Sequence, residues 1–306
     1  MRIVVHGQQA FGKSVLEALL HRGEQVIAVY CAAEKPGQRP DPLKEAALAH
    51  HLPVYQPRSF RKQEVWDEFA TLHADLCVMA YVTLFVPEEI LHLPTHGTIQ
   101  YHPSLLPRHR GPSSINWPIM WGETTTGLTI FWPDNGLDTG PILLQKEVNI
   151  LDTDTLGSLY FDQLYPLGVA ALVEAVDLVR NGTAPKIPQD EAQATYEGWC
   201  KQEDVKLDWH KPLQEVWNRI RGADPQPGAW STYQGQVVQI YDAKKLPGAA
   251  AGTPGEVVAV AAESFTVATQ SGQIEVMRVR PADGAKMRAA DFIKSTGLHQ
   301  GARLGS

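Results

Sequence analysis

A chain of 306 residues with 43% hydrophobic and 20% charged residues has the composition of an ordinary globular protein, large enough for one large and one small domain. It contains no run of about 18 apolar residues, which excludes a membrane-spanning helix and leaves no reason to expect a membrane partner. The net charge of -7 argues against a strongly nucleic-acid-binding surface.

The three cysteines and the N-terminus indicate the compartment. Cys31 and Cys77 lie in apolar, strand-like runs, and with Cys200 they make an odd number, so we expect reduced thiols. No cysteine pair has the spacing of a zinc or redox motif, so no metal is predicted. The first residues, MRIVVHGQQAFG, enter a strand at once and lack a long apolar signal region. These features favour a cytoplasmic protein.

The beginning of the chain predicts a strand, a helix and a second strand. Arg2–His6 is a β-branched run that ends at Gly7, and apolar residues recur with helical spacing over Phe11–Leu20. Gln25–Cys31 is the next strand. This order is typical of a nucleotide-type sheet. The turn GQQAFG is not the G-x-G-x-x-G fingerprint, so neither NAD nor NADP is expected.

The following elements continue this alternation. Apolar spacing predicts a helix over Leu43–His50, a short strand over Pro53–Tyr55, a helix over Gln63–Leu72 and a strand over Asp75–Ala80. The last of these, DLCVMA, is nearly all apolar, which is typical of a strand buried on both faces of a parallel sheet. The predicted fold class is therefore α/β, with a Rossmann-like, mostly parallel sheet in the N-terminal domain.

Two strand-like runs each end in a polar residue of catalytic type. Thr98–Tyr101 ends at His102, and Leu128–Trp132 ends in an acidic, glycine-containing loop that carries Asp138. In an open α/β sheet, ligands bind outside the carboxyl ends of the strands, so we expect the two side chains to converge there. A converging His and Asp form a proton-handling pair. The alternative is ordinary turn chemistry, because Asp, Asn and Gly all favour turns.

A long helix and a polar segment close the first domain. The helix is predicted to run to about Arg180 with a kink at Pro166, and Asn181-Gly182 ends it. The residues that follow are polar and contain prolines, which is typical of a linker. We therefore predict a catalytic domain over residues 1–182, a linker over residues 183–204 and a C-terminal domain over residues 205–306.

The C-terminal domain is predicted to be a small β-barrel. A short helix over Leu213–Ile220 precedes several short strands at regular spacing with turn signals between them, and a helix over Met287–Ile293 closes the domain. This pattern favours an OB-like barrel. Residues 205–306 carry 12 Lys and Arg against 9 Asp and Glu, so a polyanionic partner of this mildly basic domain stays possible.

The stretch GTIQYHPSLLPRHRG resembles a signature of the folate-dependent formyltransferases, enzymes that take the formyl group from 10-formyltetrahydrofolate. His102 with the following PSLLPRHRG is similar to the family's His-x-SLLP-x-x-RG motif, and Asp138 lies in a DTG sequence that resembles its D-x-G loop. The resemblance extends from Met1 to about Leu304. It implies 10-formyltetrahydrofolate as the formyl donor, without a metal and without NAD(P).

The resemblance also implies roles for individual residues. The family's catalytic triad is Asn, His and Asp, so His102 and Asp138 are implied to be catalytic. The Asn belongs two residues before the His, where this chain has Gln100. An amide there could hold the oxyanion only if the longer side chain of Gln100 folds back, which puts transfer efficiency in doubt.

Two further sets of residues are implied to bind ligands. The family's loop after the buried strand contributes to the folate pocket, which makes Ala80, Tyr81, Val82, Thr83, Leu84 and Phe85 candidate pterin contacts. On apolar character alone, Leu84 and Phe85 could equally be core residues. Arg108 and Arg110 are candidates for acceptor recognition, since Arg suits carboxylates and phosphates. Arg110 matches the RG dipeptide and could instead be structural, and both could be solvated loop charges.

The local sequence favours one branch of the family. The runs YHP, PRHRGPSSINW and GLDTGPILLQ look most like the hydrolase domain of 10-formyltetrahydrofolate dehydrogenase, which lacks the usual Asn and uses water as acceptor. The C-terminal runs LDWHKP and PGEVVAV look like the aminosugar and methionyl-tRNA formyltransferases. We therefore expect formyl transfer to a small-molecule amine, or to water with release of formate and tetrahydrofolate.

The alternative is a methionyl-tRNA formyltransferase acting on initiator tRNA. That enzyme carries a longer basic insertion at the position of Glu34–Glu45, whereas here three basic residues are matched by three acidic ones. A tRNA partner is therefore possible but not favoured. The sequence leaves open the identity of the acceptor, the effect of Gln100 in place of the usual Asn, and the oligomeric state.

Overall fold

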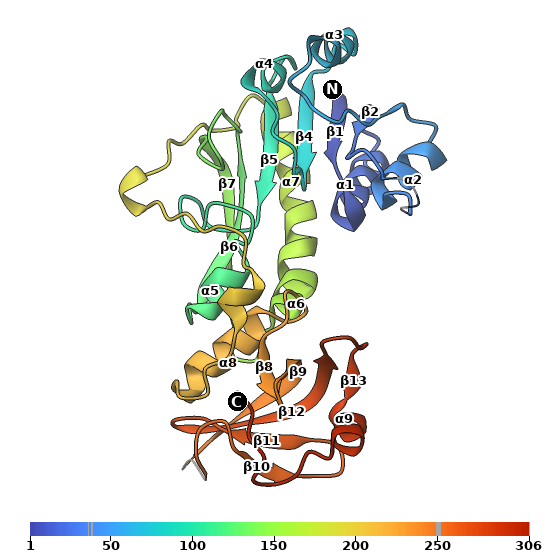
Figure 1. Cartoon of the computed structure of the whole chain (residues 1–306). Helices are drawn as coiled ribbons and strands as arrows, with labels where there is room; N and C mark the ends of the chain where they lie inside the picture. Colours follow the sequence, from blue (N-terminus) through green and yellow to red (C-terminus); the bar gives the residue numbers. More distant parts are fainter. Residues whose placement is uncertain (36, 38, 249–251, 306) are drawn as a thin grey trace. The chain divides into compact units, whose positions relative to one another are not determined.

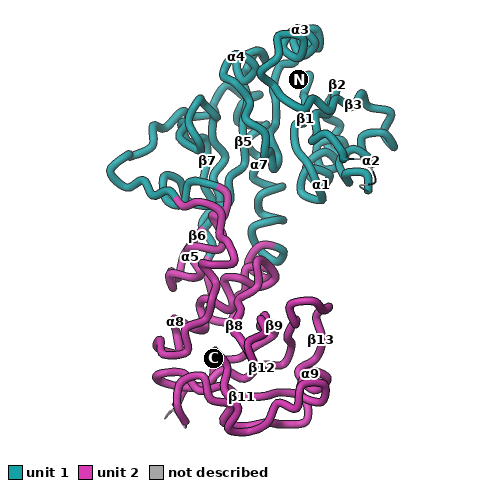
Figure 2. The backbone as a smooth tube through the Cα atoms, in the orientation of Figure 1, with its two compact units in different colours: residues 1–111, 127–148, 161–196 teal, residues 112–126, 149–160, 197–306 magenta. Residues whose placement is uncertain are grey.

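The computed structural model describes residues 1–35, 37, 39–248 and 252–305 (Figure 1). Residues 36 and 38 of the loop Glu34–Glu45 therefore lie outside the described part. The chain folds into two compact units, each assembled from several separate stretches of sequence (Figure 2). The first unit holds residues 1–111, 127–148 and 161–196, and the second holds residues 112–126, 149–160 and 197–306.

The first unit contains a seven-stranded sheet in the order β3-β2-β1-β4-β5-β6-β7. The strands are β1 (Arg2–Gly7), β2 (Gln25–Tyr30), β3 (Val54–Tyr55), β4 (Leu76–Ala80), β5 (Thr98–His102), β6 (Thr125–Phe131) and β7 (Ile142–Asn149). Neighbouring strands from β3 to β5 run parallel, whereas β6 runs antiparallel to β5. The Rossmann-like, mostly parallel sheet predicted from the sequence is confirmed.

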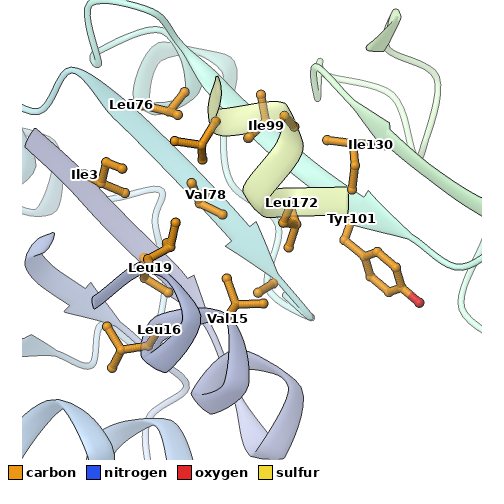
Figure 3. Packing of buried hydrophobic residues seen from close by; sticks show 14 of the residues in the cluster. Ile3, Val15, Leu16, Leu19, Leu76, Val78, Ile99, Tyr101, Ile130 and Leu172 are labelled. Atoms are coloured by element: carbon orange, nitrogen blue, oxygen red, sulfur yellow. The ribbon is translucent and has the colours of Figure 1, made fainter. Parts of the chain in front are cut away.

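Helices cover both faces of this sheet. They are α1 (Gln9–His21), α2 (Pro42–Ala49), α3 (Gln63–Thr71), α4 (Glu88–Leu91) and α7 (Tyr165–Arg180). Because side chains alternate along a strand, β1 sends Ile3 and Val5 into one core cluster and Val4 into another. Leu16 of α1 and Leu172 of α7 are fully buried in the first cluster (Figure 3). The period-2 pattern of the strands therefore divides the apolar residues between two layers.

The segment before α7 differs from the single kinked helix that the sequence predicts. The structure has a short α6 (Leu156–Ser158), then a π-helix (Leu159–Leu164), and then α7. Pro166 lies in the first turn of α7 rather than in its middle. The three elements follow one another without a break over Leu156–Arg180, so Pro166 stands directly after a π-helical turn inside one continuous helical segment. Prolines and π-turns are both common causes of irregularity in a helix.

Gly7 is held where the ends of β1 and β4 meet, and this contact makes a test of the sheet. A Cβ built on Gly7 would lie 2.2 Å from the backbone oxygen of Ala80, its partner on β4. We expect Gly7→Ala to lower the free energy of unfolding by about 1–3 kcal/mol, since neither backbone can yield without distorting the sheet. Urea denaturation measures this change. The control is Gly198→Ala, whose Cβ would meet nothing within 4 Å. Equal stability of the two variants would contradict the prediction.

The second unit is built on a curled antiparallel sheet, which confirms the OB-like prediction. The strands lie in the order β10-β11-β12-β9-β8, with β13 paired to β12. They are β8 (Trp230–Tyr233), β9 (Gln236–Pro247), β10 (Val257–Val260), β11 (Phe265–Ala268), β12 (Gly272–Pro281) and β13 (Met287–Arg288). The closing helix was expected from Met287. The structure instead has β13 there, and α9 (Ala289–Thr296) follows it.

Two helices and two short 3-10 turns complete the elements of the described residues. The helices are α5 (Asn116–Met120) and α8 (Leu213–Gly222), and the turns are Glu191–Gln193 in the first unit and Gln202–Val205 in the second. The apolar face of α8 packs in the core of the second unit, where Val216, Trp217 and Ile220 are buried. Within the described residues, no helix combines the length and the apolar character needed to cross a membrane.

Helix α8 ties together the separate stretches of the second unit. The buried guanidinium of Arg221 donates to the carbonyl oxygens of Leu151 at 3.0 Å and Asp154 at 3.2 Å. The amide of Asn116 donates to the carbonyl oxygen of Gly222 at 2.8 Å. A buried charge or donor without such acceptors is costly. Residues 112–126 and 149–160 are therefore integral parts of this unit.

Candidate active site

The structure brings His102 and Asp138 together at the end of β5. The Nδ1 atom of His102 lies 3.6 Å from Oδ2 of Asp138, and both side chains are buried, with 7% and 6% of their surfaces exposed. Gln100 lies two residues earlier on the same strand and is half-buried. Since residues two apart on a strand project from the same face, Gln100 and His102 share one face of β5.

Asp138 reaches His102 by a route that differs from the predicted one. The sequence reasoning placed both residues at the carboxyl ends of strands on the same edge of the sheet. However, β6 is antiparallel to β5, so Phe131 at the end of β6 pairs with Gln100, and His102 pairs with Thr129. The loop after β6 therefore begins beside Gln100, and its residue Asp138 then comes to His102. His102 and Asp138 do lie together as predicted, but the path of the loop after β6, and not the direction of that strand, brings Asp138 to His102.

A hydrogen bond from Nε2 orients the imidazole of His102. Nε2 lies 2.9 Å from the backbone oxygen of His109. A carbonyl oxygen can only accept a hydrogen bond, so Nε2 carries the proton that it donates. Nδ1 is then the ring nitrogen that faces Asp138 and can take part in proton transfer. A separation of 3.6 Å is longer than a hydrogen bond, and such contacts often shorten only when substrate is bound.

The carboxylate of Asp138 is fixed by the loop that follows His102. Oδ2 of Asp138 accepts a hydrogen bond from the backbone N–H of Gly111 at 2.9 Å. The backbone of Asp138 itself is left-handed, with φ of 59°. This conformation is uncommon for residues other than glycine, although Asp tolerates it better than most, and it concentrates at functional sites. The loop geometry therefore directs this carboxylate toward His102.

A polar network that the sequence reasoning missed supports the loop after His102. Thr129 of β6 accepts a hydrogen bond from the N–H of Leu106 at 3.1 Å and donates to the carbonyl oxygen of Ser104 at 2.7 Å. Gln145 of β7 donates to the carbonyl oxygen of Leu106 and to Thr129. The only sequence signal was Thr129 within the otherwise apolar run Leu128–Trp132, because these contacts join residues 16 to 39 positions apart.

The candidate folate loop is partly exposed. Ala80 ends β4 and is fully buried, whereas Tyr81 is 47% and Phe85 51% exposed. Val82 and Leu84 are half-buried and pack against the second core cluster. Thr83 is exposed, and its hydroxyl accepts a hydrogen bond from Gln8 at 3.4 Å. The loop therefore presents two large aromatic side chains to solvent beside a firmly packed base.

The two candidate arginines lie in different environments. Arg108 is exposed on the loop. Arg110 is buried, and its guanidinium makes a two-pronged ion pair with Glu191 at 2.6 and 3.0 Å. This pairing holds the pKa of the Glu191 carboxyl below its usual range. Nε and Nη2 of Arg110 also donate to the side-chain oxygen of Gln189. Arg110 thus connects the site to residues 189–191, which the sequence reasoning assigned to a linker.

Two cavities lie elsewhere in the described part of the chain. One of about 370 Å³ in the first unit is lined by residues that include His96, Trp132 and Lys186. One of about 400 Å³ in the second unit is lined by residues that include Arg221 and Tyr241. Neither is lined by Gln100, His102 or Asp138. Among the described residues, no group of three or more His, Cys, Asp or Glu side chains is placed to hold a metal ion.

Comparisons with known proteins match most of the chain to one family. Residues 1–176 match the formyl transferase profile, and residues 200–297 match the profile of the formyl transferase C-terminal domain. Mitochondrial 10-formyltetrahydrofolate dehydrogenase of Mus musculus is 43% identical over 251 residues, which are 80% of this chain and 27% of that protein. The chain therefore spans about a quarter of the length of this relative.

Two further proteins match nearly the whole chain. Methionyl-tRNA formyltransferase of Alkaliphilus oremlandii is 34% identical over 310 residues, with all of both chains covered. HypX of Aquifex aeolicus, in a crystal structure in complex with tetrahydrofolic acid, has a TM-score of 0.73 and 21% identity. The match covers 98% of this chain and 48% of that one. At this identity the likeness supports the fold alone.

Proposed function

The chain belongs to the formyl transferase family, and we propose that it moves the formyl group of 10-formyltetrahydrofolate to a small-molecule amine or to water, acting in the cytoplasm. The observation that carries this proposal is the buried pair of His102 and Asp138, with 3.6 Å between Nδ1 and Oδ2, inside the part of the chain that matches the family. The identity to 10-formyltetrahydrofolate dehydrogenase supports the same donor.

The chemistry requires two tasks, and the two residues can divide them. The nucleophile attacks the formyl carbon, a tetrahedral oxyanion forms, and the tetrahydrofolate nitrogen leaves with a proton. We assign acceptance of the nucleophile's proton to Asp138 and stabilisation of the oxyanion to His102. Because Nε2 of His102 donates to the carbonyl oxygen of His109, this role requires a second proton on Nδ1, which makes the ring a positively charged donor. The nucleophile's proton then passes to the departing nitrogen, so no net proton is gained or lost by the site. Burial of both side chains strengthens these electrostatic interactions.

We propose ligand-binding roles for the remaining predicted residues. We propose that Ala80, Tyr81, Val82, Thr83, Leu84 and Phe85 line the folate side, which is supported by the exposed rings of the loop. We propose that Arg108, exposed on the loop after His102, meets the acceptor. Because Arg110 is paired with Glu191, we propose that it holds in place the loop after His102, which also carries Arg108.

Gln100 is proposed to act as an uncharged donor to the oxyanion. If the acceptor is an amine, Gln100→Ile should lower the rate of transfer by about 10²-fold, the scale of deleting one oxyanion donor, and Gln100→Asn should preserve or raise it. If water is the acceptor, Gln100→Ile should leave formate release nearly unchanged. The measurement is tetrahydrofolate production with and without an amine. Gln273→Ile, a half-buried strand position in the second unit, is the control. Unchanged transfer to an amine would remove Gln100 from the mechanism.

The alternative function is formylation of methionyl-tRNA. It is favoured by the match over the whole length of a methionyl-tRNA formyltransferase. The segment around the start of α2 argues against it. There the Lys44 ammonium forms an ion pair with Glu34 at 2.6 Å, so its positive charge is compensated. Binding to tRNA phosphates needs uncompensated positive charge and weakens steeply with salt. We therefore expect weak tRNA binding at physiological salt.

One experiment separates these functions. The protein is incubated with 10-formyltetrahydrofolate alone, then with candidate amines, and then with initiator methionyl-tRNA, while tetrahydrofolate release is followed. Release without an acceptor supports the hydrolase, and release that depends on an amine supports the small-molecule transferase. Formylation of the tRNA at physiological salt would establish the alternative. If no tetrahydrofolate is released under any condition, the proposed function is wrong.

A further inference from the structure

The segment 189–196, called the strap below, contacts two loops of the site. One is the loop that follows His102, and the other is the loop after β6 that carries Asp138. Thr195 makes three contacts with the loop after His102. Its N–H donates to the carbonyl oxygen of Pro107 at 3.1 Å, its carbonyl oxygen accepts from the N–H of Arg110 at 3.1 Å, and its hydroxyl accepts from the N–H of His109 at 2.8 Å. The strap therefore fixes the peptide of His109, whose carbonyl oxygen orients His102.

Gln189 does the same for the loop that carries Asp138. Its Nε2 donates to the carbonyl oxygen of Asp138 at 2.9 Å and to that of Gly140 at 2.7 Å. Its Oε1 accepts from Nε and Nη2 of Arg110 at 3.1 and 2.8 Å. Both hydrogens of the amide nitrogen and both acceptor sites of the oxygen are thus in use. An amide is the one neutral side-chain group that can meet all four partners here.

These contacts form a closed circuit of hydrogen bonds and chain links through Asp138, Gln189, Arg110 and Gly111. Gln189 joins the backbone of Asp138 to the side chain of Arg110, and Gly111, the next residue, donates its N–H to the Asp138 carboxylate. Asp138 is thereby held at its carbonyl oxygen and at its carboxylate by one connected set of residues. Arg110 is anchored in turn by the ion pair with Glu191 on the strap.

We propose that Gln189 is a positioning residue of the formyl-transfer site, which sets the distance between His102 and Asp138 by holding the loop of Asp138 against the loop of His102. The inference rests on the proposed function of that pair. Gln189 touches neither of the two reacting side chains. It acts through the backbone of Asp138 and through the side chain of Arg110, the residue next to His109, whose carbonyl oxygen accepts from His102. A displacement of about 1 Å in such a site can cost about 10²-fold in rate.

The test is Gln189→Glu in the full chain. Glutamate has the same length and can still accept from Arg110, but it cannot donate to the carbonyl oxygens of Asp138 and Gly140, so it repels them. We expect kcat for tetrahydrofolate release to fall by about 10²-fold, with KM for the donor nearly unchanged and the pH profile of kcat displaced. Circular dichroism and thermal melting confirm that the variant is folded.

The control is Gln193→Glu on the same strap. The amide of Gln193 donates to Asp190 and contacts neither loop, so kcat should stay at the wild-type value. If Gln189→Glu does not fold, Gln189→Met replaces it, and failure of both to fold would show a structural role and overturn the proposal. It is also overturned if kcat of a folded variant equals that of wild type, or if kcat falls only in proportion to unfolded protein with the pH profile unmoved. Tetrahydrofolate release by the wild-type protein is measured first, so failure of the proposed function is recognised separately.

Discussion

His102→Ala should lower the rate of tetrahydrofolate release by about 10²–10⁴-fold while the protein stays folded. The substitution removes the imidazole that lies 3.6 Å from Asp138 and that we propose to stabilise the oxyanion. The side chain lies at the end of β5, so its loss leaves the strand pairing with β6 in place. Turnover under saturating donor, compared with a thermal melt of the same sample, separates loss of chemistry from loss of fold.

A second histidine provides the matched control for this variant. His92 follows α4, is exposed and pairs with Glu88 at 3.1 Å, and it lies outside the site. We expect His92→Ala to keep the wild-type rate. A His102→Ala protein that also kept that rate would show that His102 has no part in the reaction.

Asp138→Asn should lower turnover by a similar factor of about 10²–10⁴ with little change in stability. The asparagine oxygen can still accept from the N–H of Gly111, so the loop should keep its shape, but the side chain can no longer take a proton from the nucleophile. The rate is measured with and without an amine acceptor, across a range of pH.

The same loop supplies the control for the aspartate. Asp134 accepts hydrogen bonds from the N–H of Gly136 at 3.0 Å and from the hydroxyl of Thr139 at 2.6 Å. An asparagine oxygen can make both bonds, so Asp134→Asn should be active. If Asp138→Asn turns over as fast as Asp134→Asn, the charge of Asp138 has no part in the reaction.

Local patterns were sufficient to predict the elements of the fold. Strand alternation, helical spacing and terminal Gly or Asn residues are properties of neighbouring positions, and they predicted the parallel sheet and the OB-like unit. The exceptions were an element boundary and a helix irregularity. Met287 belongs to β13 and not to the closing helix, and a π-helical turn precedes Pro166 in a segment that the sequence predicts only as helix.

The candidate site was less accessible to sequence reasoning. The pairing of His102 with Asp138 was expected from strand ends, yet the antiparallel direction of β6 means that a ten-residue connection, residues 132–141, produces it. The strap was missed because its contacts are distant in sequence: Gln189 is 51 residues from Asp138 and 79 from Arg110. A polar, proline-containing stretch has the composition of a linker whether or not its amides bind a loop.

The interleaving of the two units limits how this protein can be rearranged. A fragment that begins at residue 205 would carry Arg221 into its interior without the carbonyl groups of Leu151 and Asp154 that now accept its hydrogen bonds. The C-terminal part is thus not a portable module that a single cut could release or a single junction could graft onto another enzyme. A chimaera that exchanges it would have to exchange residues 112–126 and 149–160 as well, because a single junction after residue 196 would assemble the second unit from two parents.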